Sequence, residues 1–388
     1  MNIEKISVKK KKLQFLLYKA KNIGVSAYKS YVHDRLRRKT IQNDMGASFT
    51  NLVREKDKII KRAEIKGEDK LKDEIEWNLR FKNTYFGKFL PKIYDYSLTS
   101  GDVFYKMKYY AYPNLRKIII EDLNTSYFMQ KRWRFILKVL FKKLYININS
   151  MESQKDFFEK HHLEKYRKRI KEASVEAPYL SPIIKSDIMY INQVKKLGPD
   201  NIISEIVQNK EIMKALVPPK LYIAHGDLHC NNIICGVSIS KLIFLDSRGK
   251  SPAGNLFFDP SYDIAKLYHD LHSNYSLIEK HLFEIIQTKV KGSWHIDFAF
   301  TDNDLVEKFT SHYFYVRSII EDLYQTGEFE NINYRADFTE AMLYLTMIPL
   351  HLRSSEEGLI CLATGILRLN QWLKRYHLEL YNNLISKY

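Results

Sequence analysis

The sequence predicts an α+β protein of two lobes, with a small antiparallel sheet in the N-terminal lobe and a mostly helical C-terminal lobe. Alternating apolar and polar residues between 45 and 112 indicate strands on either side of one helical stretch. After Pro113, long stretches with apolar residues at helical spacing dominate, and strands return only briefly around residues 221–246. A chain of 388 residues is long enough to bury a core in each lobe.

Residues 1–40 are predicted to form a basic helical extension. Leu13, Leu16, Leu17 and Ala20 recur at helical spacing and are flanked by lysines. Such a helix can dock on the body of the protein, which we favour, or lie on an anionic membrane through its charged face.

Residues 41–112 form the predicted N-terminal lobe. Residues 49–54 and 58–62 read as two short strands joined by a polar turn. A helix is expected over 68–82, where apolar residues recur four apart, and two further alternating runs flank the turn "LTSGD" at 98–102. The order along the chain is therefore two strands, one helix and two more strands, which predicts a small sheet with one helix beside it.

Residues 113–388 form the predicted C-terminal lobe. Amphipathic helices are expected over roughly 127–150, 154–173 and 200–215. Residues 259–388 are expected to be helical. We find no internal repeat and no low-complexity linker, so the lobe reads as one helical unit.

Composition narrows the class of protein. Hydrophobic residues make up 45% and charged residues 28% of the chain, which is typical of a folded globular protein. No apolar run approaches the roughly 20 residues that span a bilayer, and the N-terminus has no signal-peptide cleavage pattern. The three cysteines suit neither a disulfide framework nor a zinc site. We therefore expect a cytoplasmic protein.

The formal net charge of +17 suggests an anionic partner, although lysines on solvated helices would also account for it. Nucleic acid, an anionic membrane surface and phosphate-bearing substrates would all satisfy this charge. No helix–turn–helix, zinc-finger or aromatic RNA-binding pattern occurs, so nucleic acid is not expected. A peripheral contact with an anionic membrane stays open beside the cytoplasmic location.

A dense polar cluster interrupts the strands of the C-terminal lobe. The stretch "HGDLHCNN" at 225–232 is too tight and polar for a core strand, so we expect a loop there. It contains Asp227 and Asn232, and Asp246 follows at the end of the apolar strand "KLIFLD". One carboxylate can orient an attacking hydroxyl, and two further oxygen ligands suit Mg²⁺ held together with substrate phosphates.

The stretch "HGDLHCNNI", with "FLDSRG" downstream and "DPSYDIAKLYHDL" after it, resembles the aminoglycoside phosphotransferase and choline kinase family. These are small-molecule kinases with a protein-kinase-like fold, and the three motifs occur in the expected order and spacing. The resemblance implies that Asp227 is the catalytic base and that Asn232 and Asp246 bind Mg²⁺. Within the family, the last two motifs look most like phosphotransferases encoded with surface-polysaccharide (capsule) genes.

The predicted N-terminal lobe contains candidates for a second kinase feature. A kinase needs a lysine on a strand to hold the ATP phosphates and a helical glutamate to hold that lysine. Lys61 stands at the end of an apolar strand just before the helix at 68–82. Glu74 flanks the apolar face of that helix, whereas Glu76 points further away, so we favour Glu74. An ordinary surface lysine and glutamate are the alternative.

The nucleotide-contacting segments are less specific. The stretch "MGASFTNL" has Gly46 and Ser48 where protein kinases have a Gly-rich loop, and Ser48 is our candidate for a phosphate contact. By the resemblance, the backbone near Met107 to Tyr109 would meet adenine. Taken alone, that run also suits an aromatic core strand.

The first histidines of the motif raise a rival hypothesis. His225 and His229 are four residues apart and could be read with Asp227 as a metal-binding cluster. Such a pair needs a helix to face one metal, and Gly226 disfavours a helix. We therefore interpret His225 as a histidine that packs the loop.

Other side chains near the motifs are candidates for contacting the acceptor. The histidines at 269 and 272 also suit partly buried structural positions on a helix. The family comparison implies that Asp263 braces the backbone of the catalytic loop. The acceptor candidates are His229, Arg248, His269 and His272.

The resulting prediction is a Mg²⁺-dependent kinase that transfers the ATP γ-phosphate to a hydroxyl of a sugar or similar small molecule. Asp227 would orient the hydroxyl, Mg²⁺ would neutralise developing phosphate charge, and Lys61 would position the α- and β-phosphates. The sequence does not separate ATP from GTP. The basic charge fits a small-molecule or glycan acceptor that already carries phosphate or is held on a lipid carrier.

Two alternatives stay open at this point. A protein kinase is disfavoured because "HGD" replaces the H-R-D pattern, Asp246 is followed by Ser247 and Arg248 in place of D-F-G, and no A-P-E occurs. A catalytically silent binding protein that keeps the fold is supported only by the missing Gly-rich loop.

Overall fold

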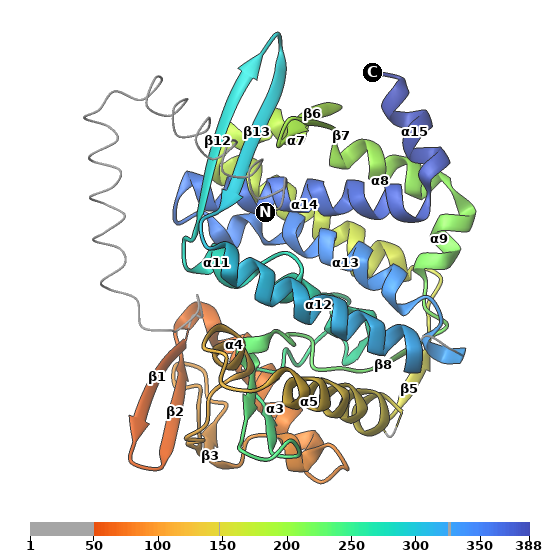
Figure 1. The fold of residues 1–388 in the computed structure, drawn as a ribbon. Helices are drawn as coiled ribbons and strands as arrows, with labels where there is room; N and C mark the ends of the chain where they lie inside the picture. Colours follow the sequence, from red (N-terminus) through yellow and green to blue (C-terminus); the bar gives the residue numbers. More distant parts are fainter. Residues whose placement is uncertain (1–49, 147, 325–326) are drawn as a thin grey trace, which may run out of the picture. The chain divides into compact units, whose positions relative to one another are not determined.

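A four-stranded antiparallel sheet forms the first part of the structure, a computed structural model that describes residues 50–146, 148–324 and 327–388. The strand order is β1-β2-β4-β3, and one helix, α3, follows β2 (Figure 1). The strands and the helix predicted for this part are confirmed. Their bounds are Thr50–Glu55 (β1), Lys58–Ala63 (β2), Glu68–Phe81 (α3), Ile93–Ser97 (β3) and Phe104–Lys108 (β4).

Helix α3 packs on one face of this sheet. Leu71 and Ile75 are one turn apart, so they lie on the same side of the helix. Both are buried in a small cluster with Val103, Tyr105 and Met107 from the segment that includes β4. Full burial of an aliphatic side chain stabilises a protein by about 1.5–3 kcal/mol, so this contact holds α3 to the strands.

The rest of the described chain is mostly helical, which confirms the two-lobed α+β class. Figure 1 shows α12, α13 and α14 lying beside one another above the sheet and α5. The longer helices are Ser126–Val139 (α5), Glu164–Glu176 (α6), Pro199–Gln208 (α8), Ser261–Leu271 (α10), Asn303–Leu323 (α12), Ile332–Met347 (α13), Ser355–Tyr376 (α14) and Leu378–Ser386 (α15). Shorter helices are Leu115–Ile120 (α4), Ser181–Ile184 (α7), Lys210–Leu216 (α9) and Tyr275–Glu279 (α11).

Helix α13 lies at the centre of this helical part. Every one of its residues is buried, and it packs against both α10 and α14. A helix buried all round must satisfy its polar side chains within the protein. Asp337 accordingly pairs with Arg317 on α12 and Arg375 on α14, and Asn333 accepts from Tyr268 on α10.

The prediction that residues 259–388 are helical is wrong in part. Strands β12 (Phe283–Val290) and β13 (Ser293–Phe300) form an antiparallel hairpin within that range. Both strands are rich in β-branched and aromatic residues, and Lys291 and Gly292 make the turn at positive φ, as tight hairpin turns require. The hairpin signal was thus present in the sequence and was overlooked.

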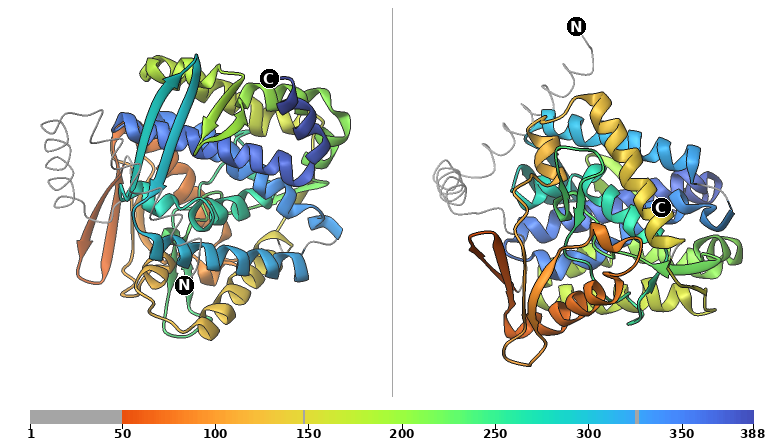
Figure 2. Two further views of the ribbon diagram at one scale, coloured as in Figure 1. Left: turned by 45° about the horizontal axis from the view of Figure 1, so that its top comes forward. Right: turned by 90° about the horizontal axis from the view of Figure 1, so that it is seen from below.

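Two strands that the sequence analysis did not predict complete this sheet. They are β6 (Ile188–Ile191) and β7 (Val194–Leu197), and the strand order is β12-β13-β6-β7. In Figure 1 and in the left view of Figure 2 the hairpin (cyan) passes across α14, and β12 contacts that helix.

Two small antiparallel sheets hold the segment with the polar cluster. Strand β8 (Lys220–Ile223) lies between β5 (Ser150–Glu152) and β11 (Phe257–Phe258). Strand β9 (Ile233–Cys235) pairs with β10 (Leu242–Phe244). The predicted helix at 127–150 therefore ends early, because α5 continues as a π-helix only to Tyr145 and β5 starts at Ser150.

None of the helices that the structure describes is long and apolar enough to cross a membrane. The predicted basic extension at 1–40 lies outside the described residues, as do Gly46 and Ser48.

Candidate active site

Strand register brings Lys61 to helix α3. Lys61 on β2 lies directly opposite Tyr105 on β4, so both side chains leave the same face of the sheet. Lys61 Nζ lies 2.8 Å from Glu74 Oε2, and the Tyr105 hydroxyl donates to Glu74 Oε1 at 2.7 Å. Glu76 is exposed. The structure thus brings together the lysine and the glutamate that the sequence analysis chose, while their role in phosphate binding stays a prediction.

The pair is buried, with Lys61 5% exposed and Glu74 2% exposed. Burial alone would lower the pKa of Lys61, but the carboxylates of Asp246 and Glu74 raise it above the ordinary value. Burial raises the pKa of Glu74, and Lys61 opposes that shift. Lys61 therefore carries a full positive charge at neutral pH.

The loop after β8 is held by one buried carboxylate. Asp263, in the first turn of α10, accepts hydrogen bonds from the backbone N–H groups of His225 at 2.9 Å and Gly226 at 2.7 Å. The Tyr145 hydroxyl donates to the same carboxylate at 3.0 Å. These contacts are those that a residue bracing the loop would make, as the family comparison implied for Asp263.

Gly226 has a backbone conformation that favours glycine. Its φ is +79°, in the left-handed region that L side chains rarely adopt. A Cβ at this position would lie 2.7 Å from the Cβ of Arg248 and 2.8 Å from the Cζ of Phe258. Both the turn and the close approach of the next segment therefore require glycine here.

Asp227 follows in the loop, and its side chain is 21% exposed. Lys266 Nζ on α10 lies 2.9 Å from Asp227 Oδ1. Burial by itself would raise the pKa of Asp227, but Lys266 and then His229 hold it well below its usual value. Asp227 is therefore ionised at neutral pH, as a group that orients a hydroxyl must be.

Lys266 is not among the site residues predicted from the sequence. A signal for it existed, because Lys266 stands three residues after Asp263 in "DPSYDIAKL", and residues at that spacing share one face of a helix.

Two asparagines fix the second half of the loop. Asn232 Nδ2 donates to the backbone oxygen of Asp227 at 2.9 Å, which leaves the side-chain oxygen of Asn232 outside that bond. Asn231 Oδ1 accepts from Asn114 Nδ2 at 2.6 Å, which ties the loop to the residue that caps α4. Asn231 thus has a structural role that its sequence position did not reveal.

Asp246 comes just after β10 and is joined to the N-terminal sheet. Its φ is +59°, an uncommon conformation for a non-glycine residue that is often found at functional sites. Its Oδ1 lies 2.8 Å from Lys61 Nζ, and its side chain is 41% exposed. Burial would raise the pKa of Asp246, but Lys61 lowers it below the ordinary value. Asp246 is therefore a partly exposed, ionised carboxylate.

The oxygen donors here suit Mg²⁺, which prefers carboxylate and carbonyl oxygens together with substrate phosphates. Asp246 offers a carboxylate with an accessible edge, and Asn232 offers an amide oxygen. Over the described part of the chain, no group of three or more His, Cys, Asp or Glu side chains could hold a metal ion. The rival reading of a metal cluster at His225 and His229 is therefore not supported.

His225 is buried beside the loop. Its ring lies edge-to-face with Trp77, its Nδ1 accepts from the backbone N–H of Asp227 at 3.3 Å, and burial lowers its pKa. These contacts agree with a histidine that packs the loop. His229 is partly buried close to Asp227, with its ring edge-to-face with Tyr275.

His269 does not occupy an open position. It is 3% exposed, and its Nε2 lies 3.3 Å from the sulfur of Met347. Burial lowers its pKa well below the ordinary value, so it is neutral. These contacts support the alternative of a structural histidine and do not support an acceptor contact.

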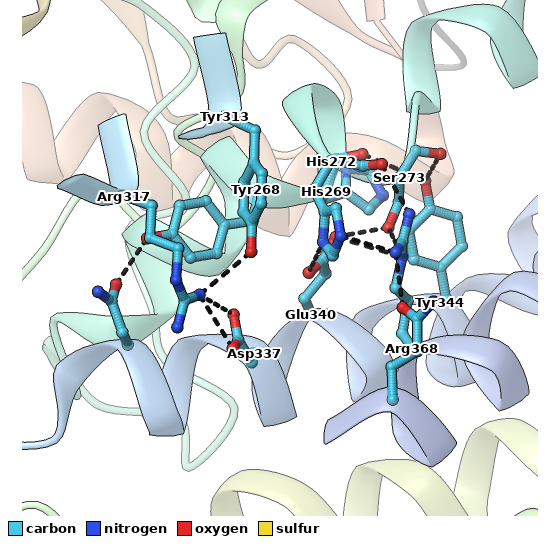
Figure 3. Close-up of polar contacts among 12 residues, drawn as sticks. Tyr268, His269, His272, Ser273, Tyr313, Arg317, Asp337, Glu340, Tyr344 and Arg368 are labelled. Carbon is cyan, nitrogen blue, oxygen red and sulfur yellow. Dashed lines mark hydrogen bonds and ion pairs between the residues drawn. The ribbon is translucent and has the colours of Figure 1, made fainter. Parts of the chain in front are cut away.

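His272 belongs to a buried network between α10, α13 and α14 (Figure 3). Its ring stacks on Tyr313 with centroids 4.1 Å apart, and its Nδ1 lies 3.0 Å from Glu340 Oε2. Arg368 reaches its Nε2 at 2.7 Å. All its polar atoms are thus engaged by protein groups, so a structural role again fits better than acceptor binding.

In the predicted adenine segment, Tyr109 already makes a backbone hydrogen bond within the protein. Its backbone N–H donates to the oxygen of Asp57 at 2.7 Å, and the guanidinium of Arg54 lies 3.8 Å from the centre of its ring. That N–H cannot donate to a base while it makes this bond. Met107 is 5% exposed in the core beneath the sheet, which agrees with the alternative of a core strand.

The remaining acceptor candidate, Arg248, follows Asp246 and faces α10. Its backbone N–H donates to the oxygen of His225 at 2.8 Å, and its Nη1 donates to the Tyr262 hydroxyl at 3.0 Å. Arg248 is thus held in place at the loop that contains Asp227.

The parts of this site occur in the order that the protein-kinase-like fold requires. The lysine on a strand is followed by its helical glutamate, then by the loop with Asp227, and then by Asp246 at the end of a strand. The predicted fold class is confirmed in this respect as well.

No family model and no curated protein sequence matches this chain. Among solved structures it is similar to the crystal structure of an aminoglycoside-3′-phosphotransferase of type VIII. The TM-score is 0.37 and the sequence identity 8%, over 85% of this chain and 92% of the other. Similarity this low transfers neither an activity nor residue roles.

Proposed function

We propose that this chain is a Mg²⁺-dependent phosphotransferase that moves the γ-phosphate of ATP to a hydroxyl of a small molecule. The observation that carries the proposal is the double contact of Lys61, which lies 2.8 Å from Glu74 and 2.8 Å from Asp246. A phosphate-binding lysine in a kinase is held by a helical glutamate close to the metal-binding aspartate.

Asp227 is the proposed group that accepts or orients the hydroxyl proton. Its low pKa keeps it ionised. The backbone N–H groups of His225 and Gly226 donate to Asp263, which fixes the backbone that leads into Asp227. General-base catalysis by a positioned carboxylate contributes typically about 10²–10⁴-fold to the rate. Lys266 sits beside the same carboxylate and would limit its basicity until the acceptor enters.

Asn232 and Asp246 are the proposed holders of Mg²⁺, which when bound neutralises charge on the transferring phosphate. Lys61, fully charged and anchored by Glu74, would hold the α- and β-phosphates. Asp246 and Lys61 form an ion pair at 2.8 Å, so the proposed metal-binding and phosphate-binding charges lie side by side.

A sugar or a glycan is our first choice of acceptor, and the resemblance to phosphotransferases encoded with surface-polysaccharide genes supports it. We also propose that the reaction takes place in the cytoplasm, as the composition led us to expect.

The test compares the purified wild-type chain with Asp227→Asn, measuring ADP release with Mg²⁺·ATP and a panel of sugars. Turnover is expected to fall by about 10²–10⁴-fold in the variant. Asp304→Asn, an exposed change of the same type on α12, serves as the matched control and should leave turnover unchanged. Equal turnover in Asp227→Asn and wild type would remove Asp227 from the mechanism.

Two further measurements separate this proposal from its alternatives. Thermal shifts with Mg²⁺·ATP should stabilise the wild type, because a ligand that binds only the folded state stabilises it. Binding without turnover of any acceptor would favour a silent binding protein. Strong phosphorylation of a peptide library in place of sugars would favour a protein kinase.

A further inference from the structure

Three cationic side chains converge beside the loop that contains Asp227. They come from α6, from the segment after β10 and from α10, and two of them meet at the hydroxyl of Tyr262. Arg248 Nη1 lies 3.0 Å from that oxygen and Lys165 Nζ lies 3.5 Å from it. We refer to Lys165, Arg248 and Lys266 together as the cation cluster.

The cation cluster has more positive charge than nearby carboxylates can balance. Asp227 is the carboxylate within it, and Asp227 is already paired with Lys266. Neither Lys165 nor Arg248 forms an ion pair with any carboxylate of the described residues. Three partly buried cations and one carboxylate leave an excess of two positive charges, and charges withdrawn from water without partners are costly.

The pKa values of Tyr262 and Lys165 agree with this excess of positive charge. Burial lowers the pKa of Lys165 to about 8, and the neighbouring Arg248 and Lys266 also disfavour its charge. Burial would raise the pKa of Tyr262, yet Arg248, Lys165 and Lys266 together lower it to about 8. A phenol with a lowered pKa is a sign of strong positive potential at its oxygen.

Beside Tyr262, Lys165 lines a small pocket. Its free volume is about 10 Å³, room for about one water molecule, and Thr339 and Thr346 also line it. Two buried histidines complete the polar side of its wall. Burial lowers their pKa values to about 4 for His161 and about 3 for His162, so neither adds charge.

We propose that the cation cluster binds an anionic group of the acceptor, a phosphate ester or a carboxylate, and so places a neighbouring hydroxyl at Asp227. An anionic group would take over the role of acceptor that the Tyr262 hydroxyl now fills for Lys165 and Arg248. The proposal rests on the phosphotransferase function above and assigns its acceptor class, because neutral or cationic sugars would leave the excess charge unpaired.

The first test measures binding of inorganic phosphate to the full chain by calorimetry, with the nucleotide site filled by Mg²⁺ and a non-hydrolysable ATP analogue. Charge-assisted hydrogen bonds make a large contribution, so Lys165→Gln and Arg248→Gln should each weaken phosphate binding by about 10- to 100-fold. Lys168→Gln changes an exposed lysine on the same helix and should bind phosphate as the wild type does. Equal phosphate affinity in all four proteins would overturn the proposal.

Folding of the variants has its own control. Lys165→Arg keeps the charge and should keep most of the phosphate affinity. Lys165→Gln should not lower the thermal midpoint, since it removes a partly buried charge that has no carboxylate partner. A loss of affinity in Lys165→Arg equal to that in Lys165→Gln would show a packing effect and would contradict anion binding.

The second test is a turnover screen with matched neutral sugars, sugar phosphates and uronic acids. The anionic acceptors should be preferred, and the arm that reacts identifies the anion. In Lys165→Gln and Arg248→Gln the KM for that acceptor should rise by about 10- to 100-fold with the KM for ATP unchanged. Preferential turnover of neutral sugars overturns the cation cluster as acceptor site but leaves the kinase function standing. Phosphate binding that depends on the cluster, with no turnover of any acceptor, contradicts the kinase function alone.

Discussion

Lys61 Nζ lies 2.8 Å from Asp246 Oδ1, although the two residues are 185 positions apart in the chain. The contact joins strand β2 of the N-terminal sheet to the segment after β10. Because Glu74 lies at the same distance from the same ammonium group, one buried charge is shared by two carboxylates. The same ammonium group therefore serves the packing of the fold and the phosphate-binding role that we propose for Lys61.

Removing the lysine should destabilise the fold. Lys61→Met leaves Glu74 buried without its cation, and removing one partner of a buried pair costs about 3–5 kcal/mol. The free energy of unfolding can be measured by denaturant titration. Lys66→Met, which removes an exposed lysine, should cost less than about 0.5 kcal/mol.

The double variant tests the physical reason. Lys61→Met with Glu74→Gln removes the unpaired carboxylate, so it should be more stable than Lys61→Met alone. If the double variant is no more stable than the single one, the cost comes from lost packing and not from the buried charge.

The need for glycine at position 226 can be tested against Gly254, which serves as a matched control. Gly226 and Gly254 both have φ +79°, but a Cβ at Gly254 would meet nothing within 4 Å. Gly254→Ala should therefore cost only the left-handed conformation, about 1 kcal/mol. Gly226→Ala must also displace Arg248 and Phe258, so it should cost clearly more and reduce turnover. Equal unfolding free energies for the two variants would show that the close contact is relieved without cost.

The Tyr145 hydroxyl, which donates to Asp263, should make a modest contribution to stability. Tyr145→Phe removes one hydrogen bond to the carboxylate but leaves the two bonds from His225 and Gly226. A net loss of about 1 kcal/mol in unfolding free energy is expected, with turnover largely retained. Asp263→Asn replaces an acceptor of all three bonds and should lower turnover strongly; retained turnover there would mean that Asp263 does not hold the loop.

Anion binding should weaken as the pH rises through about 8. Lys165 loses its positive charge and Tyr262 gains a negative one in that range, since both have a pKa of about 8. Sulfate is a suitable calorimetric probe because its own charge is constant between pH 7 and 9.5. Arg248 and Lys266 have raised pKa values and stay charged, so some affinity should persist. Affinity for sulfate that is constant over this range would contradict the assignment.

Raising the pH should stabilise the fold through Lys165, although it weakens anion binding. The folded pKa of Lys165 is lowered from 10.5 to about 8, so the unfolded chain binds more protons between these values. The contribution of Lys165 to stability therefore rises as the pH increases from about 8 towards 10.5. Lys165→Gln should remove this part of the pH dependence of the unfolding free energy.

We propose that the basic N-terminus binds anionic membranes through the charge of its lysines. Replacing the four lysines at 9–12 by glutamine should weaken binding to anionic vesicles by about 1 kcal/mol per lysine near the surface, and added salt should weaken wild-type binding. Vesicle sedimentation measures both effects, with uncharged vesicles as the control. Unchanged binding by the substituted chain would leave no role for these lysines at a membrane.

Much of the local structure could be predicted from the sequence. Alternation and helical spacing located the four N-terminal strands and α3, because these elements each have one buried face. The hairpin at 283–300 was missed for a different reason: its β-branched pattern was outweighed by the helical segments around it. Strands as short as β6 and β7 have too few residues for a periodic pattern to be recognised.

The candidate site, too, could be predicted only in part from the sequence. The polar loop at 225–232 and the carboxylate at the end of the "KLIFLD" strand were visible in the sequence, because polar groups between apolar runs are unusual. The sequence did not reveal that Asp227 pairs with Lys266. It also did not reveal that Lys165 and Arg248 both contact the Tyr262 hydroxyl.

The sequence by itself determined the order of the elements, the chemistry available in the loop and the glutamate on α3 that faces inward. Only the tertiary structure decided which charges meet. A side chain of long reach such as Lys61 or Lys165 can find partners in any segment that packs against it, so spacing along the chain does not specify them. Burial then enforces the pairing, since a charge removed from water requires either a partner or a bound ligand.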